Sequence, residues 1–241
     1  RDSGRFRYHL NELRDRFVEK ADGGYRLTHA GEQVVGAILA GTYTDDVSLG
    51  PAEIDGVCPD CGEAAVATCE GGVCRVGCAN DHRLFQWSVP PNATRQATLS
   101  EVVDLAELLA RQAIECSLAG VCPTCYDPVT PTLTPRGADE QPRFDADCPS
   151  CGGRVVGPGG FCLLVDSRVA AFYRRHGRPI DERHLWELGF VTDGAACRVV
   201  EEKPLCAEFV VTLDDETLVV TLDGRGRVVG VDGPDTLSPE R

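Results

Sequence analysis

The chain has 241 residues, of which 42% are hydrophobic, with 26 glycines, 15 prolines and a formal net charge of -14. This length leaves room for one to three small domains, and the glycine and proline content favours compact, loop-rich modules over one large core. No stretch approaches the roughly 18 consecutive apolar residues of a membrane-spanning helix, and no signal-peptide pattern opens the chain. We therefore expect a cytoplasmic protein that does not enter the membrane.

Residues 1–42 have the periodicity of a helix, a hairpin and a second helix. The first helix is expected to begin at Ser3, a favoured N-cap residue. Its apolar residues recur at helical spacing and form one stripe: Phe6, Leu10, Leu13 and Phe17. Two short alternating runs follow, joined by a glycine-rich turn at residues 22–24, which is typical of a β-hairpin. Thr28 then begins a helix that ends near Leu39.

This order of elements resembles the recognition helix, wing and closing helix of ArsR-like winged helix-turn-helix regulators. The two helices that would precede them in a complete domain are expected before Arg1. Such a helix enters the major groove of double-stranded DNA, where its side chains contact base edges and phosphates. The resemblance implies these DNA contacts: Ser3, Arg5, Arg7, Tyr8, Asn11, Arg14, Lys20 and Arg26. The alternative is a small helical hairpin domain used for dimerisation or partner binding.

The charge is distributed unevenly along the chain. Residues 1–33 hold seven basic and six acidic side chains, a sum of +1, so the remaining residues carry -15. This asymmetry has the sign expected of a nucleic-acid-facing end on a body that repels nucleic acid. Only two of the 24 basic residues are lysines. The acidic, lysine-poor composition resembles that of proteins from salt-in halophiles, in particular haloarchaea, although a GC-rich genome with an acidic protein is the alternative.

The clearest motif is a pair of C-x-x-C turns separated by 22 residues. It is formed by Cys122, Cys125, Cys148 and Cys151. Two such turns present four thiolates to one tetrahedral Zn²⁺ ion, with no position left open for substrate or water. We therefore expect a structural zinc ribbon, with a redox dithiol or an iron–sulfur cluster as the alternatives.

A second zinc site is expected nearer the start of the chain. Cys58 and Cys61 form an equally good turn, and two predicted strands around residues 70–72 return the chain to it. Cys78 and His82 are then the closing pair, with Cys74 or Asp81 as the substitute fourth ligand. The strand cysteines Cys69 and Cys74 are otherwise expected to pack as small apolar residues, and so are the remaining four: Cys116, Cys162, Cys197 and Cys206.

The predicted fold class is α+β with several modules. Residues 43–56 are expected to form a linker, 57–92 the first zinc ribbon, and 98–118 an amphipathic helix capped by Ser100. A second ribbon follows at residues 119–160. The last module is expected at 161–233: a helix capped by Asp166, a short helix from Asp181, and an antiparallel meander of four strands, before a loose tail at 234–241.

Motifs of catalysis are missing from the sequence: it has no P-loop, no G-x-S-x-G, no H-E-x-x-H and no dinucleotide fingerprint. We expect no enzymatic activity. The order of modules resembles haloarchaeal ArsR-type regulators with zinc ribbons. The resemblance implies a DNA-binding transcriptional regulator that binds a small-molecule effector and forms a homodimer, for which the helix from Ser100 is the candidate interface. A zinc-ribbon adaptor without DNA binding and a metal or redox sensor are the alternatives.

Overall fold

The computed structural model describes residues 3–39, 48–137 and 140–234. Its first part contains the expected helix, hairpin and helix: α1 (Ser3–Leu13), β1 (Val18–Ala21), β2 (Gly24–Leu27) and α2 (His29–Leu39). The two strands pair in antiparallel register, with Glu19 opposite Arg26. The apolar stripe of α1 is largely uncovered, because the side chain of Phe6 is 70% exposed and that of Leu13 is 44% exposed. The stripe is therefore available for contact with another surface.

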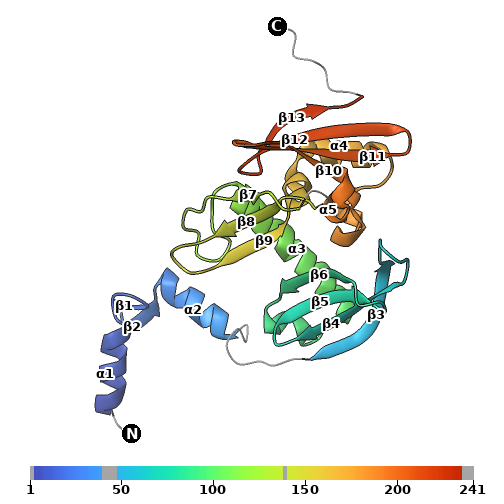
Figure 1. The fold of residues 1–241 in the computed structure, drawn as a ribbon. Coiled ribbons are helices and arrows are strands. Elements are labelled where there is room, and N and C mark those ends of the chain that lie inside the picture. Colours follow the sequence, from blue (N-terminus) through green and yellow to red (C-terminus); the bar gives the residue numbers. More distant parts are fainter. Residues whose placement is uncertain (1–2, 40–47, 138–139, 235–241) are drawn as a thin grey trace.

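The first metal module is built on a four-stranded antiparallel sheet in the order β3-β4-β5-β6 (Figure 1). The strands are β3 (Leu49–Val57), β4 (Ala64–Glu70), β5 (Val73–Cys78) and β6 (Arg83–Ser88). In β4 the buried residues Ala65, Ala67 and Cys69 alternate with more exposed ones, as expected for a sheet covered on one face. The short helical turn η1 (Pro91–Thr94) follows the sheet.

The predicted linker at residues 43–56 is wrong from Leu49 onward, where β3 begins; residues 43–47 lie outside the described part. Gly50, Pro51 and Gly56 give this segment the composition of a loop, yet all three lie within the strand. The sheet order explains the difference, because β3 lies at an edge, where a proline without an N–H group costs no ladder hydrogen bond.

The helix α3 (Leu99–Leu118) connects the two metal modules and covers the β3-β6 sheet. The predicted helix at 98–118 is confirmed, but its cap is Thr98 and not Ser100. Thr98 Oγ1 accepts a hydrogen bond from the Glu101 N–H group at 3.3 Å, and the Glu101 carboxylate accepts one from the Thr98 N–H group at 2.7 Å. This is a reciprocal capping box, which Ser100 cannot form because Val103 lies three residues after it.

The second metal module contains a three-stranded antiparallel sheet, in the order β7-β8-β9. Its strands are β7 (Thr132–Thr134), β8 (Arg143–Asp147) and β9 (Arg154–Pro158). Phe144, Ala146 and Val155 are buried in it. The chain then enters a 3-10 segment, η2 (Gly159–Val165), which contacts α3.

The last part combines short helices with the predicted meander. Asp166 caps α4 (Ser167–Arg175), as expected, and the four strands β10 (Cys197–Glu202), β11 (Leu205–Leu213), β12 (Glu216–Asp223) and β13 (Val228–Asp232) form one antiparallel sheet in chain order. The single helix predicted from Asp181 is wrong. Three short elements replace it, namely η3 (Ile180–Glu182), η4 (Leu185–Glu187) and α5 (Gly189–Thr192), and η5 (Gly194–Ala196) follows them.

These modules share one hydrophobic core. A single cluster of buried side chains extends from Ile54 in β3 to Leu222 in β12 and includes Trp186, which is fully buried as a core residue. Figure 1 shows α3 passing through the middle of this assembly, between the β3-β6 sheet and the β7-β9 sheet. Within the described residues, no helix is both long and apolar enough to cross a membrane.

Candidate metal centres

The structure brings together the four side chains predicted for the first metal site. Cys58 and Cys61 lie in the turn after β3, Cys78 ends β5, and His82 precedes β6. His82 Nδ1 lies 3.3 Å from Cys58 Sγ and 3.5 Å from Cys78 Sγ, and the Sγ atoms of Cys61 and Cys78 are 3.7 Å apart. All four ligand atoms lie within 4.8 Å of one another, so they could hold one metal ion.

The second predicted site is also assembled. The Sγ atoms of Cys122 and Cys151 are 3.7 Å apart, and those of Cys125 and Cys148 are 3.5 Å apart. The Gly153 N–H group points to Cys151 Sγ at 3.3 Å, as expected for a sulfur that carries negative charge. Cys122, Cys148 and Val129 are buried in a small cluster of their own around this centre.

Both clusters have the dimensions of a tetrahedral zinc site. With Zn–S bonds of about 2.3 Å and Zn–N bonds of about 2.0 Å, a tetrahedron places two sulfurs ~3.8 Å apart and a sulfur and a nitrogen ~3.5 Å apart. The sulfur pairs of both centres, at 3.5 to 3.7 Å, and the imidazole pairs, at 3.3 and 3.5 Å, agree with these values. Each set of four also completes the tetrahedron, which leaves no open position for a substrate.

The C-x-x-C turns owe their shape to a repeated backbone pattern. In each of the three turns the first cysteine donates its N–H group to a carbonyl five residues later, and its own carbonyl accepts an N–H group four residues later. That later residue has a positive φ, and it is Gly62, Tyr126 or Gly152. Glycine adopts this conformation without steric cost, which explains why glycine follows two of the turns. The same backbone hydrogen bonds thus give all three turns the same shape.

Hydrogen bonds inside the turns lower the pKa of two thiols. The pKa of Cys122 falls to about 6, chiefly because the Cys125 N–H group stabilises the thiolate. The pKa of Cys61 also falls to about 6, with the side chain of Asn80 as the largest cause and the Glu63 N–H group as the second. The other cysteine of each turn shifts the other way: burial raises the pKa of Cys58, and the neighbouring cysteine side chains raise the pKa of Cys125 to about 12. Without metal, each of the two turns therefore favours one thiolate near neutral pH.

The open choice for the fourth ligand of the first site is resolved in favour of His82. Cys74 lies inside β5, opposite Cys69 in β4, and both side chains are fully buried away from the metal cluster. Burial raises the pKa of Cys74 to about 12, which keeps it a neutral thiol. Asp81 occupies the turn before His82, with a positive φ of 60°. The expected packing role of Cys69 and Cys74 is confirmed.

A third group of possible ligands was not predicted from the sequence. Asp104 and Glu107 on α3 approach His184, with their ligand atoms within 4.8 Å of one another. Glu107 is already occupied, however: one carboxylate oxygen lies 2.9 Å from His184 Nδ1, and the other accepts the Leu185 N–H group at 2.6 Å. The Glu107 side chain therefore connects α3 to η4. It also explains why the helix predicted from Asp181 is interrupted, because the Leu185 N–H group donates to Glu107 and not to a carbonyl of the preceding turn.

The candidate DNA-contacting residues lie on α1 and the hairpin. Arg5, Arg7, Tyr8 and Asn11 are exposed on α1, which begins at Ser3; the side chain of Ser3 is outside the described part. Arg14 follows the helix and lies 3.6 Å from the Asp15 carboxylate.

The two hairpin candidates differ in their surroundings. Lys20 is exposed in β1. Arg26 in β2 forms an ion pair with Glu19 on the opposite strand, with Nε and Oε1 2.7 Å apart. Any phosphate contact by Arg26 would have to compete with this pair.

Comparison with known proteins gives two family matches. Residues 1–38 match the family described as a domain of unknown function, DUF7347, and residues 55–228 match the family described as a domain of unknown function, DUF7351. No curated protein and no solved structure matches the chain. The boundary between the two matches falls between α2 and the end of β3, so the helix–hairpin–helix unit and the metal-binding body are separate sequence families. The second match spans both candidate metal centres and most of the chain, and the protein belongs to the DUF7351 family.

Proposed function

We propose that the protein is a DNA-binding transcriptional regulator whose body is held together by two structural zinc ions. The observation that carries the DNA-binding part is the surface of α1. Helical spacing puts Tyr8 and Asn11 on the side opposite Phe6 and Leu10, with Arg7 at the edge of that side, and all three are exposed. A helix with such a polar face beside a two-stranded hairpin supports the ArsR-like winged-helix assignment.

Zinc is the metal that best fits the donor sets. Thiolate and imidazole ligands in a closed tetrahedron are typical of structural zinc. The metal would supply folding energy and no reaction chemistry, because the four ligands of each centre fill its coordination sphere. The grouping of seven of the thirteen cysteines into two metal clusters supports a reducing compartment, and we assign the protein to the cytoplasm.

The charge distribution supports an orientation on DNA. The chain outside residues 1–33 carries -15, so it is repelled by phosphate, whereas the first 33 residues carry +1. Only the N-terminal unit can then approach the duplex closely. In a haloarchaeal cell this charge effect would be weaker, because concentrated salt screens the repulsion and the counterion-release term alike, and more of the affinity would then come from base contacts.

Binding to genomic DNA fragments in vitro is the direct test, with a matched pair of double variants. Arg5→Ala with Arg7→Ala should weaken binding about 10-fold or more and make the salt dependence shallower by about one to two phosphate contacts. Arg225→Ala with Arg227→Ala changes the charge equally at the turn before β13 and should leave binding unchanged. Equal affinity of the two double variants would refute the assignment of α1 as the recognition helix.

A protein-binding adaptor is the second candidate, because large apolar side chains are exposed on both helices of the N-terminal unit. They are Phe6, Leu13, Val34, Val35, Ile38 and Leu39. Such a surface suits a protein partner or a second copy of the chain. Two measurements distinguish the adaptor from the DNA-binding regulator. If the protein is an adaptor, the double variant Phe6→Ser with Ile38→Ser should abolish complex formation in cells. The unchanged protein should then bind no DNA fragment.

A further inference from the structure

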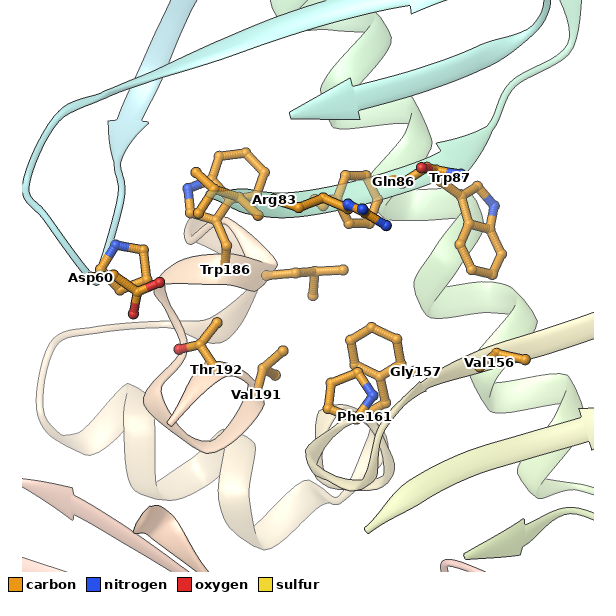
Figure 2. A pocket seen from close by; sticks show the side chains of 15 residues that line it. Asp60, Arg83, Gln86, Trp87, Val156, Gly157, Phe161, Trp186, Val191 and Thr192 are labelled. Carbon is orange, nitrogen blue, oxygen red and sulfur yellow. The ribbon is translucent and has the colours of Figure 1, made fainter. Parts of the chain in front are cut away.

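A cleft with a volume of about 360 Å³ lies where the first metal module meets the C-terminal part of the chain (Figure 2). Strand β6 forms one side, the end of β9 and the start of η2 form the opposite side, and η4 and α5 form the third. These walls come from segments far apart in the sequence. The volume lies within the range of about 300 to 1,000 Å³ that is typical of small-molecule sites.

The walls of the cleft are rich in aromatic rings. Figure 2 shows Trp87 on the β6 side, Phe161 opposite it and Trp186 on the third side. Trp186 stacks on the His184 ring, with centroids 4.2 Å apart and planes 6° from parallel, and Phe161 and Trp186 are both buried. Rings held in this way favour a flat apolar ligand, which can meet them by offset stacking or edge-to-face contact.

One cation faces this apolar space. Arg83 is exposed at the start of β6, and Figure 2 shows its guanidinium group lying along the roof of the cleft. Within residues 3–39, 48–137 and 140–234 the side chain of Arg83 has no ion pair and no hydrogen bond, although its backbone pairs with Gly77 in β5. The one acidic side chain of the lining, Asp60, lies at the end of the cleft away from that group.

A polar group is also left unpaired in the wall. The Nε1 atom of Trp186 is buried and has no hydrogen-bond partner among the described residues. Burial of an indole N–H group without an acceptor costs free energy, and native structures rarely leave such a group unsatisfied. The cleft therefore combines apolar rings with an available cation, while the unpaired indole N–H group is buried behind its wall.

We propose that this cleft binds a small aromatic carboxylate. The ring of the ligand lies between Trp87 and Phe161, and its carboxylate accepts hydrogen bonds from the Arg83 guanidinium, which can donate in bidentate geometry. An inorganic anion would leave the rings unused, and a neutral aromatic compound would leave the guanidinium unpaired. The inference concerns the body of the protein and does not depend on DNA binding by α1.

The protein contains its own reporter for this site. Its two tryptophans, Trp87 and Trp186, both line the cleft, so all tryptophan emission originates there. We would titrate the zinc-loaded full chain with benzoate and phenylacetate, and follow emission together with calorimetry. Benzyl alcohol and acetate are the controls, because the first lacks the charge and the second lacks the ring. The expected result is saturable binding of the two aromatic acids and at least about 10-fold weaker binding of both controls.

Three variants locate the site. Arg83→Ala should weaken benzoate binding by about 10-fold or more, whereas Arg225→Ala, at an exposed arginine outside the cleft, should leave it unchanged. Thr192→Phe places a ring at the exposed rim and should block binding without adding tryptophan emission. Circular dichroism and zinc content verify that each variant is folded.

Two results would overturn the proposal. One is the absence of saturation by either aromatic acid up to about 10 mM, which corresponds to an affinity too weak for a formed site. The other is equal binding by the Arg83→Ala and Arg225→Ala proteins. Loss of DNA binding in the α1 variants with benzoate binding intact would show that the two proposals stand independently.

Discussion

The carboxylate of Glu107 and the imidazole of His184, 77 positions apart in the chain, meet inside the protein with Oε2 and Nδ1 2.9 Å apart. Glu107 is buried on α3, and His184 immediately precedes η4. The contact joins the helix between the metal modules to the segment that carries Trp186. It also brings an ionisable pair to the place where the core is assembled.

This pair should make stability depend on pH. The Glu107 hydrogen bond raises the pKa of His184 above its ordinary 6.5, and the charges of Glu107, Glu187 and Asp104 act in the same direction. Folding therefore favours the protonated ring, and its contribution is fully present below about pH 6.5 and lost as the pH rises through the raised pKa. Urea midpoints of the zinc-loaded protein should fall over this window. His184→Gln should remove that part of the slope, whereas His29→Gln, at an exposed histidine, should retain it.

Removal of the Glu107 carboxylate should cost more than the loss of one ion pair. Glu107→Ala leaves the buried Leu185 N–H group without its acceptor as well as the His184 ring without its partner. We expect the free energy of unfolding to fall by about 2 to 4 kcal/mol. Glu115→Ala, on the same helix at an exposed position, should change it by less than about 0.5 kcal/mol. An equal decrease in the free energy of unfolding in the two variants would mean that the contacts of Glu107 with His184 and Leu185 do not stabilise the fold.

Metal content should follow the two clusters. Purified protein should contain two zinc ions per chain, and Cys61→Ser and Cys125→Ser should each lower the count to one. Cys206→Ser, at a half-buried cysteine in β11, should leave two. The measurement is elemental analysis with protein quantified by amino-acid content. Iron in place of zinc, or a count unaffected by Cys125→Ser, would contradict the assignment.

Substitutions at the residue after a C-x-x-C turn should change the stability of the second centre in opposite directions at Gly152 and at Tyr126. Gly152 has a φ of +73°, so Gly152→Ala should destabilise the second centre by about 1 kcal/mol. Tyr126 adopts nearly the same conformation, with a φ of +65° and an exposed side chain, and Tyr126→Gly should be neutral or slightly stabilising. Zinc-release rates with a chelator measure both. If both variants are destabilised equally, the positive φ at these positions does not determine the stability of the centre.

A buried amide holds η2 against α5. Gln141 Nε2 donates to the carbonyl groups of Phe190 and Asp193, at 3.0 and 2.9 Å, and its Oε1 accepts the Gly160 N–H group at 3.1 Å. Gln141→Leu leaves these three backbone groups unpaired and should lower the free energy of unfolding by about 2 to 4 kcal/mol. Gln112→Leu, at an exposed position of α3, is the control. Thermal unfolding separates the two, and equal midpoints would refute the role of the amide.

The metal ligands could be predicted because their information is local in sequence. Spacing of cysteines within a turn, and turn residues such as Gly62 and Gly152, indicated both centres before the fold was known. The meander was equally predictable from alternating apolar residues, and α4 from its Asp166 cap. The predicted assignment of α1 to DNA recognition stays a prediction, as does the enzyme-free character of the protein.

The contacts between distant segments could not be predicted in the same way. Glu107 resembles any acidic residue on an amphipathic helix, and only the fold brings His184 and the Leu185 N–H group to it. The sequence around Asp181 has helical composition, but that tertiary hydrogen bond interrupts it. The role of Arg83 could not be predicted either, because four segments far apart in the sequence form the cleft, and no local motif marks them.

The position of α3 links the two metal centres mechanically. The last turn of the helix continues directly into the second centre: the Val121 N–H group donates to the Cys116 carbonyl, and Cys122 is the next residue. The other end of the same helix lies on the sheet that carries the first centre. Loss of the metal ion at Cys122 should therefore destabilise the C-terminal turn of α3. The rest of this helix packs on the sheet that carries the first centre. Both centres are thus connected to the same helix, and removal of the metal ion from one should lower the affinity of the chain for the metal ion at the other.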